Sequence, residues 1–165
     1  MISAMDKNYP IKSYKDLLVW QKAHQLIGKI FCLVKKARKD VISWEIIKQL
    51  VRSATSIAAN IVEGYYSHKG KTFISHLEIA KGSAGETDNW IFELYSNGYI
   101  TKEEYEDASK DCFEIIKMLS GLINKIRERD KYRRLTLISN LLSLSSNHFV
   151  CVDNFIAFLG ERVYN

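Results

Sequence analysis

The sequence predicts an all-α protein: an antiparallel, up-down-up-down four-helix bundle followed by a C-terminal tail that is either helical or poorly ordered. Three observations predict this fold class. The 165 residues include only one proline and eight glycines, whereas a β-sandwich or barrel needs many more turn residues. Hydrophobic residues make up 47% of the chain, which is enough for a buried core. Apolar residues also recur at steps of three and four along four segments, as they do in amphipathic helices.

The first helix is expected to begin at Ser13, because a serine followed three residues later by an acid, Asp16, can cap the free amides of a helix. The charged residues 38–40 interrupt this helix. His24 lies in or beside the apolar stripe, and we expect a hydrogen-bonded packing histidine there rather than a metal ligand. The stripe comprises Leu17, Trp20, His24, Ile27, Phe31 and Val34.

The second and third helices are expected to fold back on each other around residue 69. Ser43 is the expected cap of the second helix, and Gly64 together with residues 67–70 ends or kinks it. Residues 97–98, Asn-Gly, end the third helix because both residue types tolerate the left-handed conformation. The two apolar stripes comprise Ile47, Leu50, Ala54, Ile57 and Ile61, and then Phe73, Leu77, Ala80, Ala84, Thr87, Ile91 and Leu94.

Small residues are frequent on these two helices, and they predict close packing. A glycine inside a helix costs about 1 kcal/mol relative to alanine, so Gly82 and Gly85 suggest that another backbone approaches the third helix closely. If the chain reverses around residue 69, Arg52 lies level with Glu86. We therefore predict an ion pair between these two side chains.

Thr101 and Glu104 form a predicted capping box at the start of the fourth helix. The domain organisation expected from these segments is an extension over residues 1–12, a bundle over 13–129 and a tail over 130–165. Four alternatives stay open for the tail: it forms a fifth helix, covers the bundle, docks on another subunit or is poorly ordered. The fourth stripe comprises Tyr105, Ala108, Cys112, Ile115, Leu119, Leu122 and Ile126.

The three cysteines, Cys32, Cys112 and Cys151, are odd in number and widely spaced, which argues against a disulfide framework or a zinc site. We expect reduced thiols and a cytoplasmic location. Residues 1–10 lack the apolar run of a signal peptide, and the apolar run 149–159 is too short to span a bilayer. The sequence therefore predicts no membrane association.

No catalytic residue, cofactor or metal site is predicted. The chain has no Gly-rich phosphate-binding loop and no dinucleotide fingerprint. None of its four histidines follows a glutamate by three residues, as a di-iron bundle requires. Glu63, Glu78 and Glu86 fall at different levels of two helices, so we interpret them as structural polar contacts.

Positive charge is concentrated at the N-terminus. Residues 1–48 carry ten Lys and Arg against four Asp and Glu, a balance of +6, whereas the whole chain carries +5. Lysines spaced by seven share one face of the first helix, and a second cluster closes the fourth helix. These cations predict phosphate contacts without base specificity, and a solvated helix face is the alternative interpretation. The predicted nucleic-acid ligands are Lys15, Lys22, Lys29, Lys36, Arg38, Lys39, Lys125, Arg127 and Arg129.

Several linked motifs resemble a bacterial four-helix-bundle family known from intervening sequences of 23S rRNA genes. They are Asp-Leu-Leu-Val-Trp-Gln-Lys-Ala at 16–23, Arg-Ser-Ala-Thr-Ser-Ile-Ala-Ala-Asn-Ile-Val-Glu-Gly at 52–64, Ile-Ala-Lys-Gly-Ser-Ala-Gly-Glu at 79–86 and Gly-Tyr-Ile at 98–100. The resemblance covers residues 13–128. Ala58 replaces a proline that is frequent in the family, and Tyr-Ser-His at 66–68 replaces its usual Gly-Arg.

The resemblance implies a ring-shaped homopentamer that binds structured RNA or DNA and is not an enzyme. A similar protein is the accessory protein of diversity-generating retroelements, which engages a reverse transcriptase and its RNA. The alternative functions are therefore a protein-interaction module for such a partner, or a reading frame with little host function. Positions shared with the family predict a polar network between the second and third helices, made of Arg52, Asn60, Glu63, Ser83 and Glu86.

Overall fold

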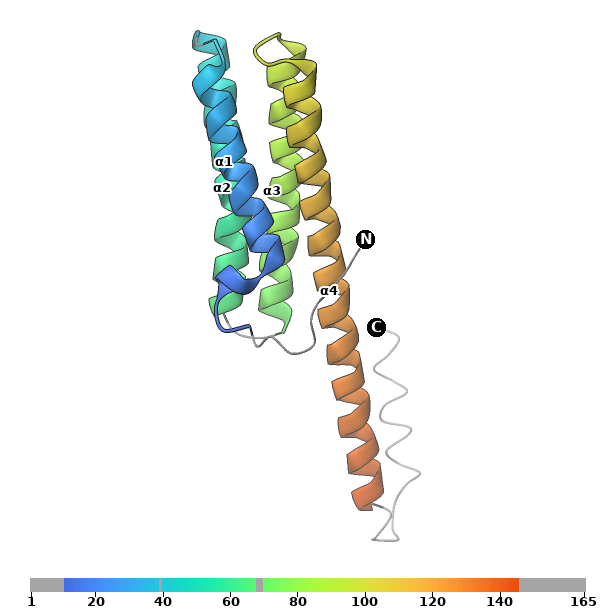
Figure 1. Ribbon diagram of the computed structural model, residues 1–165. Coiled ribbons are helices and arrows are strands. Elements are labelled where there is room, and N and C mark those ends of the chain that lie inside the picture. The colour runs from blue at the N-terminus through green and yellow to red at the C-terminus, as the bar shows by residue number, and fades with distance from the viewer. Residues whose placement is uncertain (1–10, 39, 68–69, 146–165) are drawn as a thin grey trace. The chain divides into compact units, whose positions relative to one another are not determined.

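The computed structural model describes residues 11–38, 40–67 and 70–145, with side chains described as far as residue 139. Over these residues the chain forms helices and no strand, which confirms the all-α prediction. The chain divides into two compact units, Met1–Ile126 and Arg127–Asn165. The elements are η1 (Tyr14–Asp16), α1 (Leu18–Lys36), α2 (Val41–Tyr66), α3 (Lys71–Ser96) and α4 (Lys102–Ser145) (Figure 1).

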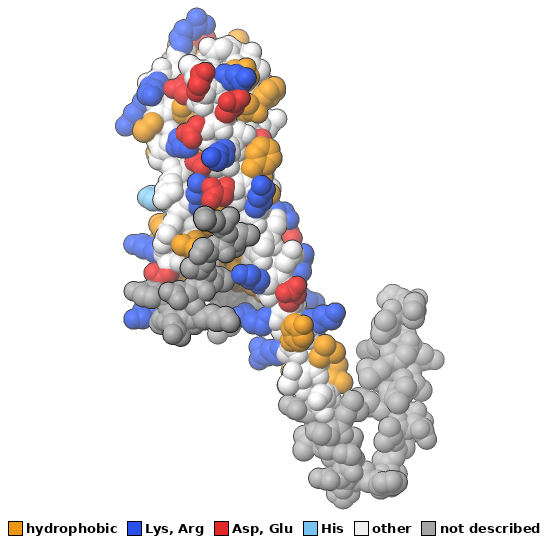
Figure 2. Space-filling model, turned by 45° about the vertical axis from the view of Figure 1, so that its right-hand side comes forward, with side chains coloured by type: hydrophobic (Ala, Val, Ile, Leu, Met, Phe, Trp, Pro, Cys, Tyr) orange, Lys and Arg blue, Asp and Glu red, His pale blue; other side chains and the backbone are white. Residues whose placement is uncertain are grey.

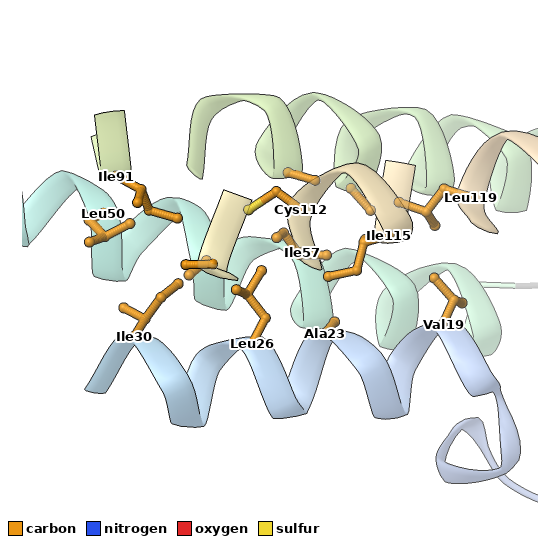
Figure 3. Close-up of a cluster of buried hydrophobic side chains, with 14 of the residues drawn as sticks. Val19, Ala23, Leu26, Ile30, Leu50, Ile57, Ile91, Cys112, Ile115 and Leu119 are labelled. Carbon is orange, nitrogen blue, oxygen red and sulfur yellow. The ribbon is translucent and has the colours of Figure 1, made fainter. Parts of the chain in front are cut away.

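The first unit holds a core to which all four helices contribute. Figure 3 shows Leu26 of α1, Ile57 of α2, Ile91 of α3 and Ile115 of α4 turned toward a common interior. All four side chains are fully buried. Burying a side chain of this size contributes about 1.5–3 kcal/mol, so this shared interior is the main source of stability. No helix among the described residues is long and apolar enough to cross a membrane.

Contacts between the helices run in opposite senses. On α2 and α3, Ser53 bonds to Thr87, while Ser56, one turn later, pairs with Ser83, one turn earlier. Lysines along α1 likewise meet acids of α4 in reverse order. Both pairs are therefore antiparallel, which fits the predicted up-down-up-down order.

The Ser13–Asp16 capping box is present, but it caps the N-terminus of η1 rather than that of α1. The Asp16 carboxylate accepts from the Ser13 amide at 2.8 Å. Leu17 then adopts an extended conformation, with φ −74° and ψ 114°, and its side chain is buried. This extended residue separates the short turn from α1, which begins at Leu18.

The predicted stripe of α1 packs against the core only in part, through Leu17, Trp20, Ile27 and Val34, and the most buried residues of the helix lie one position away. The residues that α1 buries are Val19, Ala23, Leu26, Ile30 and Leu33. Adjacent residues on a helix differ by 100° in direction, so the predicted stripe lies beside the true one. Phe31 is 44% exposed, and His24 is exposed and stacks on Trp20 with ring centroids 5.2 Å apart. His24 therefore packs on a neighbouring ring, as expected, but no hydrogen bond joins its side chain to another described residue.

The predicted stripe of α2 is buried as expected, but its cap is Asp40 rather than Ser43. Asp40 accepts from the Ser43 amide at 2.8 Å, and the Ser43 hydroxyl accepts from the Asp40 amide at 2.9 Å. The Tyr99 hydroxyl also donates to Asp40, at 3.0 Å. The Ser43 amide foremost, and then Tyr99 and Arg38, lower the pKa of Asp40 to about 2.

Glycines play different parts along the α2–α3 pair. Gly64 lies inside α2, which continues to Tyr66, and a Cβ there would lie 2.8 Å from Cδ2 of Phe73. Gly64 therefore permits the close packing of Phe73. The close approach predicted at Gly82 and Gly85 is wrong, because both are exposed and no atom lies within 4 Å of the position of an added Cβ.

The structure confirms the predicted start of α4. The Glu104 carboxylate accepts from the Thr101 amide at 3.0 Å, and the Thr101 hydroxyl accepts from the Glu104 amide at 3.2 Å. The helix continues to Ser145, so residues 130–145 extend α4 and do not form a separate fifth helix. The remaining parts of the predicted extension and tail, residues 1–10 and 146–165, lie outside the described residues.

Candidate nucleic-acid interface

Three of the predicted phosphate ligands lie on α1 and face acidic side chains of α4. Lys22 Nζ is 2.8 Å from Asp111 Oδ1 and 2.7 Å from Glu114 Oε2. Lys29 Nζ is 2.7 Å from Asp107 Oδ2 and 2.6 Å from Asp111 Oδ2. Lys36 is more exposed and lies 3.8 Å from Glu104. We call this set the α1–α4 seam: Lys22, Lys29, Lys36, Glu104, Asp107, Asp111 and Glu114.

Asp111 is the centre of the seam because it binds two lysines while only 9% exposed. Burial alone would raise the pKa of Asp111, but hydrogen bonds from Lys22 and Lys29 outweigh burial and lower it. Burial likewise opposes the charge of Lys29, but Asp107 and Asp111 raise the pKa of that lysine. Hydrogen bonds to Asp111 and then Glu114 raise the pKa of Lys22. All three groups are held in their charged forms.

This geometry favours a structural role for Lys22 and Lys29. An ammonium group has three donors. Lys29 directs two at carboxylates and one at the backbone oxygen of Asp107, 3.3 Å away, so a phosphate would have to displace one of these partners. Lys22 directs two donors at carboxylates, with which a phosphate would have to compete. On the face of the bundle seen in Figure 2, acidic and basic side chains are interleaved in the same manner.

The other predicted cations of the N-terminal part are placed differently. Lys15 belongs to η1 rather than to the α1 face, and its exposed Nζ lies 6.0 Å from the centre of the Tyr14 ring. Arg38 pairs with the cap Asp40 at 3.1 Å. Lys39 lies outside the described residues.

The densest group of cations lies on α4, at the start of the second unit. We call residues 127–134 the basic segment; it carries five cations and two acids, a balance of +3. All five cations are exposed. Arg129, Arg133 and Arg134 make no ion pair with any described residue. Lys125 is also exposed and precedes this segment, in the first unit.

The predicted polar network is present in part between α2 and α3. Ser83 pairs with Ser56 at 3.0 Å, and Asn60 donates to Ser56 at 3.1 Å. His76 Nδ1 lies 3.5 Å from Asn60 Oδ1 and 3.6 Å from Glu63 Oε2. Asn60, Glu63 and Ser83 are thus brought together through two residues that the sequence did not single out for the network, Ser56 and His76.

Arg52 and Glu86 lie outside this network, and the predicted ion pair between them is wrong. No ion pair joins them in the part of the chain that the structure describes, and Glu86 accepts from the Trp90 indole at 3.2 Å. The predicted register is close, since the neighbouring Ser53 meets Thr87. The ion pair does not form because Ser53 faces α3. Arg52 is adjacent to Ser53 on the helix and therefore points about 100° away from it.

The described residues contain no cluster of metal-binding type, and their two cysteines differ in exposure. Nowhere in that part of the chain do three or more His, Cys, Asp or Glu side chains converge on a possible metal position. The Cys112 thiol is buried, and burial, followed by Asp88 and Asp111, raises its pKa to about 12. Cys112 is therefore a poor nucleophile at neutral pH. Cys32 is free and exposed, and Cys151 lies outside the described residues.

Comparisons with known proteins agree with this architecture. A family model described as 23S rRNA-intervening sequence protein matches residues 15–121. A solved structure from Bacteroides thetaiotaomicron, a protein of unknown function from the S23 ribosomal protein family, is 35% identical with a TM-score of 0.58. That match covers 64% of this chain and 98% of the other. A comparison with curated proteins returns no match.

Proposed function

Because the chain belongs to the family of 23S rRNA-intervening sequence proteins, we propose that it is a non-enzymatic bundle that binds structured RNA through phosphate contacts. The observation that carries this proposal is the basic segment. Its cations are exposed on two turns of one helix, and three of its arginines have no carboxylate partner among the described residues. Lys22 and Lys29 of the seam, in contrast, are already paired with carboxylates at 2.6–2.8 Å.

The composition of the basic segment fits a phosphate ligand. Its eight residues span about 12 Å of helix, and arginine binds phosphate oxygens through two parallel N–H donors. Such contacts supply affinity without reading bases. The described part of the chain shows no module that recognises particular bases, so RNA shape is the expected source of any preference.

The test is fluorescence anisotropy of a labelled RNA hairpin across a range of salt concentrations. We expect the slope of log K against log salt to be negative, with about 0.9 per phosphate neutralised on a duplex. The variant Arg129→Gln/Arg133→Gln/Arg134→Gln is expected to bind at least about tenfold more weakly, with a slope shallower by about 2–3.

A matched control removes three positive charges from exposed positions of α4 that belong to the first unit. Lys102→Gln/Lys110→Gln/Lys117→Gln changes the net charge equally and is expected to retain most of the affinity. If both variants lost the same affinity for the hairpin, the net charge of the protein, and not the position of the arginines, would explain the loss. Absence of hairpin binding by the wild type near physiological salt would overturn the proposal.

A protein-interaction function is the alternative, and one observation favours it. Tyr132, Leu135 and Ile138 recur at steps of three on α4 and are 48–70% exposed. This stripe would suit a protein partner such as a reverse transcriptase. Serine substitutions at the three positions would then abolish capture of that partner while leaving hairpin binding intact.

We also propose that the protein is cytoplasmic and homo-oligomeric, with a pentamer as the expected state. Support comes from large apolar side chains exposed on the bundle, among them Phe31, Ile79 and Phe92. In a ring, five copies of a modest basic surface add to one strong field. Light scattering of the full chain measures the stoichiometry, and a monomer at micromolar concentration would contradict this part.

A further inference from the structure

Five aromatic rings gather where η1 meets the C-terminal end of α2. We call them the ring cluster. Tyr14 contacts Trp20 with centroids 5.0 Å apart, and it contacts the two tyrosines of α2 at 6.5 and 6.1 Å. His24 stacks on Trp20 with an interplanar angle of 5°. The cluster consists of Tyr14, Trp20, His24, Tyr65 and Tyr66.

The ring cluster combines three partly buried rings with two exposed residues. Tyr14, Trp20 and Tyr65 are partly buried and pack against the core of the bundle. Tyr66 is 64% exposed, and His24 is also exposed. Tyr14 links the two exposed rings, because it touches both Tyr66 and the Trp20 on which His24 stacks. Two exposed residues are therefore held beside three rings that pack against the core.

Two lysines and one acid neighbour Tyr14 in the chain. Lys15 Nζ lies over the Tyr14 ring, and Lys12 is exposed two residues before it. Neither lysine makes an ion pair with a described residue. The nearby acid, Asp16, accepts from the backbone amides of Lys12 and Ser13 at 2.9 and 2.8 Å, so its carboxylate is already engaged.

We propose that the ring cluster is a stacking platform for unpaired bases of a single-stranded nucleic acid, with Lys12 and Lys15 binding the adjoining phosphates. Aromatic rings stack on every base, and cations beside them hold the backbone. A quaternary ammonium ligand also favours aromatic rings, but the two lysines would repel it. This inference rests on the proposed nucleic-acid function and adds the class of ligand, an unpaired strand.

The test compares two labelled DNA 12-mers that have the same number of phosphates, one of thymidines and one abasic. Stacking predicts that the full-length wild type binds the thymidine strand about tenfold or more tightly than the abasic strand. Tyr66→Leu and His24→Leu are expected to remove most of that preference while leaving abasic binding unchanged. Tyr66→Phe keeps a ring and is expected to retain the preference.

Two controls separate stacking from charge and from loss of an exposed ring elsewhere. Lys12→Gln/Lys15→Gln is expected to weaken binding of both strands by the same factor. Trp44→Leu removes an exposed aromatic side chain from the opposite end of α2. This variant is expected to keep the wild-type affinity for both strands. Unchanged abasic binding and circular dichroism in the Tyr66 and His24 variants exclude a folding defect.

The outcomes distinguish this inference from the function on which it rests. Equal affinity of the wild type for the two strands, with a steep salt slope, would overturn the platform and leave phosphate binding standing. A base preference that survives both Tyr66→Leu and His24→Leu would also overturn the platform. Failure to bind either strand or the RNA hairpin would overturn both proposals.

Discussion

The α1–α4 seam and the basic segment look alike in the sequence, but they differ in structure. Each contains several cations of one helix: three lysines of α1 in the seam, and five lysines and arginines of α4 in the basic segment. In the seam, Lys22 and Lys29 meet three carboxylates at 2.6–2.8 Å. In the basic segment, the cations are exposed, and three arginines have no carboxylate partner among the described residues.

The role of a cation thus depends on residues far away in the chain. Lys29 reaches Asp107, which is 78 residues later. The two acids of the basic segment, Glu128 and Asp130, lie among five cations and leave an excess of +3. A count of charge by segment therefore shows where cations are, whereas the helix pairing shows which of them remain open to a ligand.

The largest expected effect comes from removing the shared carboxylate of the seam. Asp111→Asn leaves two partly buried ammonium groups with fewer partners, so we expect a loss of about 2 kcal/mol in the free energy of unfolding. Thermal denaturation followed by circular dichroism should show a Tm lower by about 4–8 °C.

Glu106→Gln is the matched control for this substitution. Glu106 pairs with Lys102 at 3.6 Å on the exposed face of the same helix. Its loss should cost less than about 0.5 kcal/mol. If both variants lost the same stability, the seam would be no more than an ordinary surface ion pair.

The second prediction concerns the pH dependence of the seam. The pKa of Asp111 is lowered in the folded state from its usual 3.8, so its contribution to stability is complete above pH 3.8 and is lost as pH falls below it. Denaturant unfolding between pH 6 and 3 should show a steeper decline for the wild type than for Asp111→Asn. Parallel profiles would contradict this assignment.

A third and smaller effect is expected at the cap of α2, outside both regions. Because the pKa of Asp40 falls to about 2 on folding, its contribution is present above pH 3.8 and is lost between pH 3.8 and 2. Asp40→Asn can still accept a hydrogen bond, so its Tm at pH 7 should fall by only about 2–4 °C. The difference in Tm from the wild type should shrink at pH 2, and a constant difference would refute the assignment.

The smallest expected effect on stability is in the basic segment. Arg129→Gln/Arg133→Gln/Arg134→Gln removes side chains without a described carboxylate partner, so the free energy of unfolding should change by less than about 0.5 kcal/mol. Denaturant titration measures this change beside the loss of hairpin affinity. A large destabilisation would place these arginines in structural contacts and remove the contrast with the seam.

The sequence predicted the fold well because its strongest signals are local. The capping box of Thr101 and Glu104 and the apolar stripes of α2 and α3 depend on spacings within one helix, and the structure confirms them. In α1 two adjacent stripes are apolar, so spacing alone did not decide between them. Packing buried Leu26 and Ile30, whereas Ile27 is partly buried and Phe31 is 44% exposed.

The candidate site was harder to predict because it depends on contacts between helices. Lys22 and Lys29 were correctly placed on one face of a helix, but nothing within that helix shows which neighbour the face meets. One signal was present: Asp107, Asp111 and Glu114 recur at steps of four and three on the fourth helix. Summing charge over residues 101–165 gives zero and conceals this acidic stripe.

The seam also joins the first helix of the bundle to the last, which has a consequence for folding kinetics. Contacts between α2 and α3 link residues 16–34 positions apart, whereas Lys29 and Asp107 are 78 apart. Closing the longer loop costs more chain entropy, so we expect the seam to form late, after the folding transition state. In stopped-flow measurements, Asp111→Asn should then accelerate unfolding and leave the folding rate nearly unchanged. The seam would thus govern how long the folded bundle persists rather than how quickly it forms.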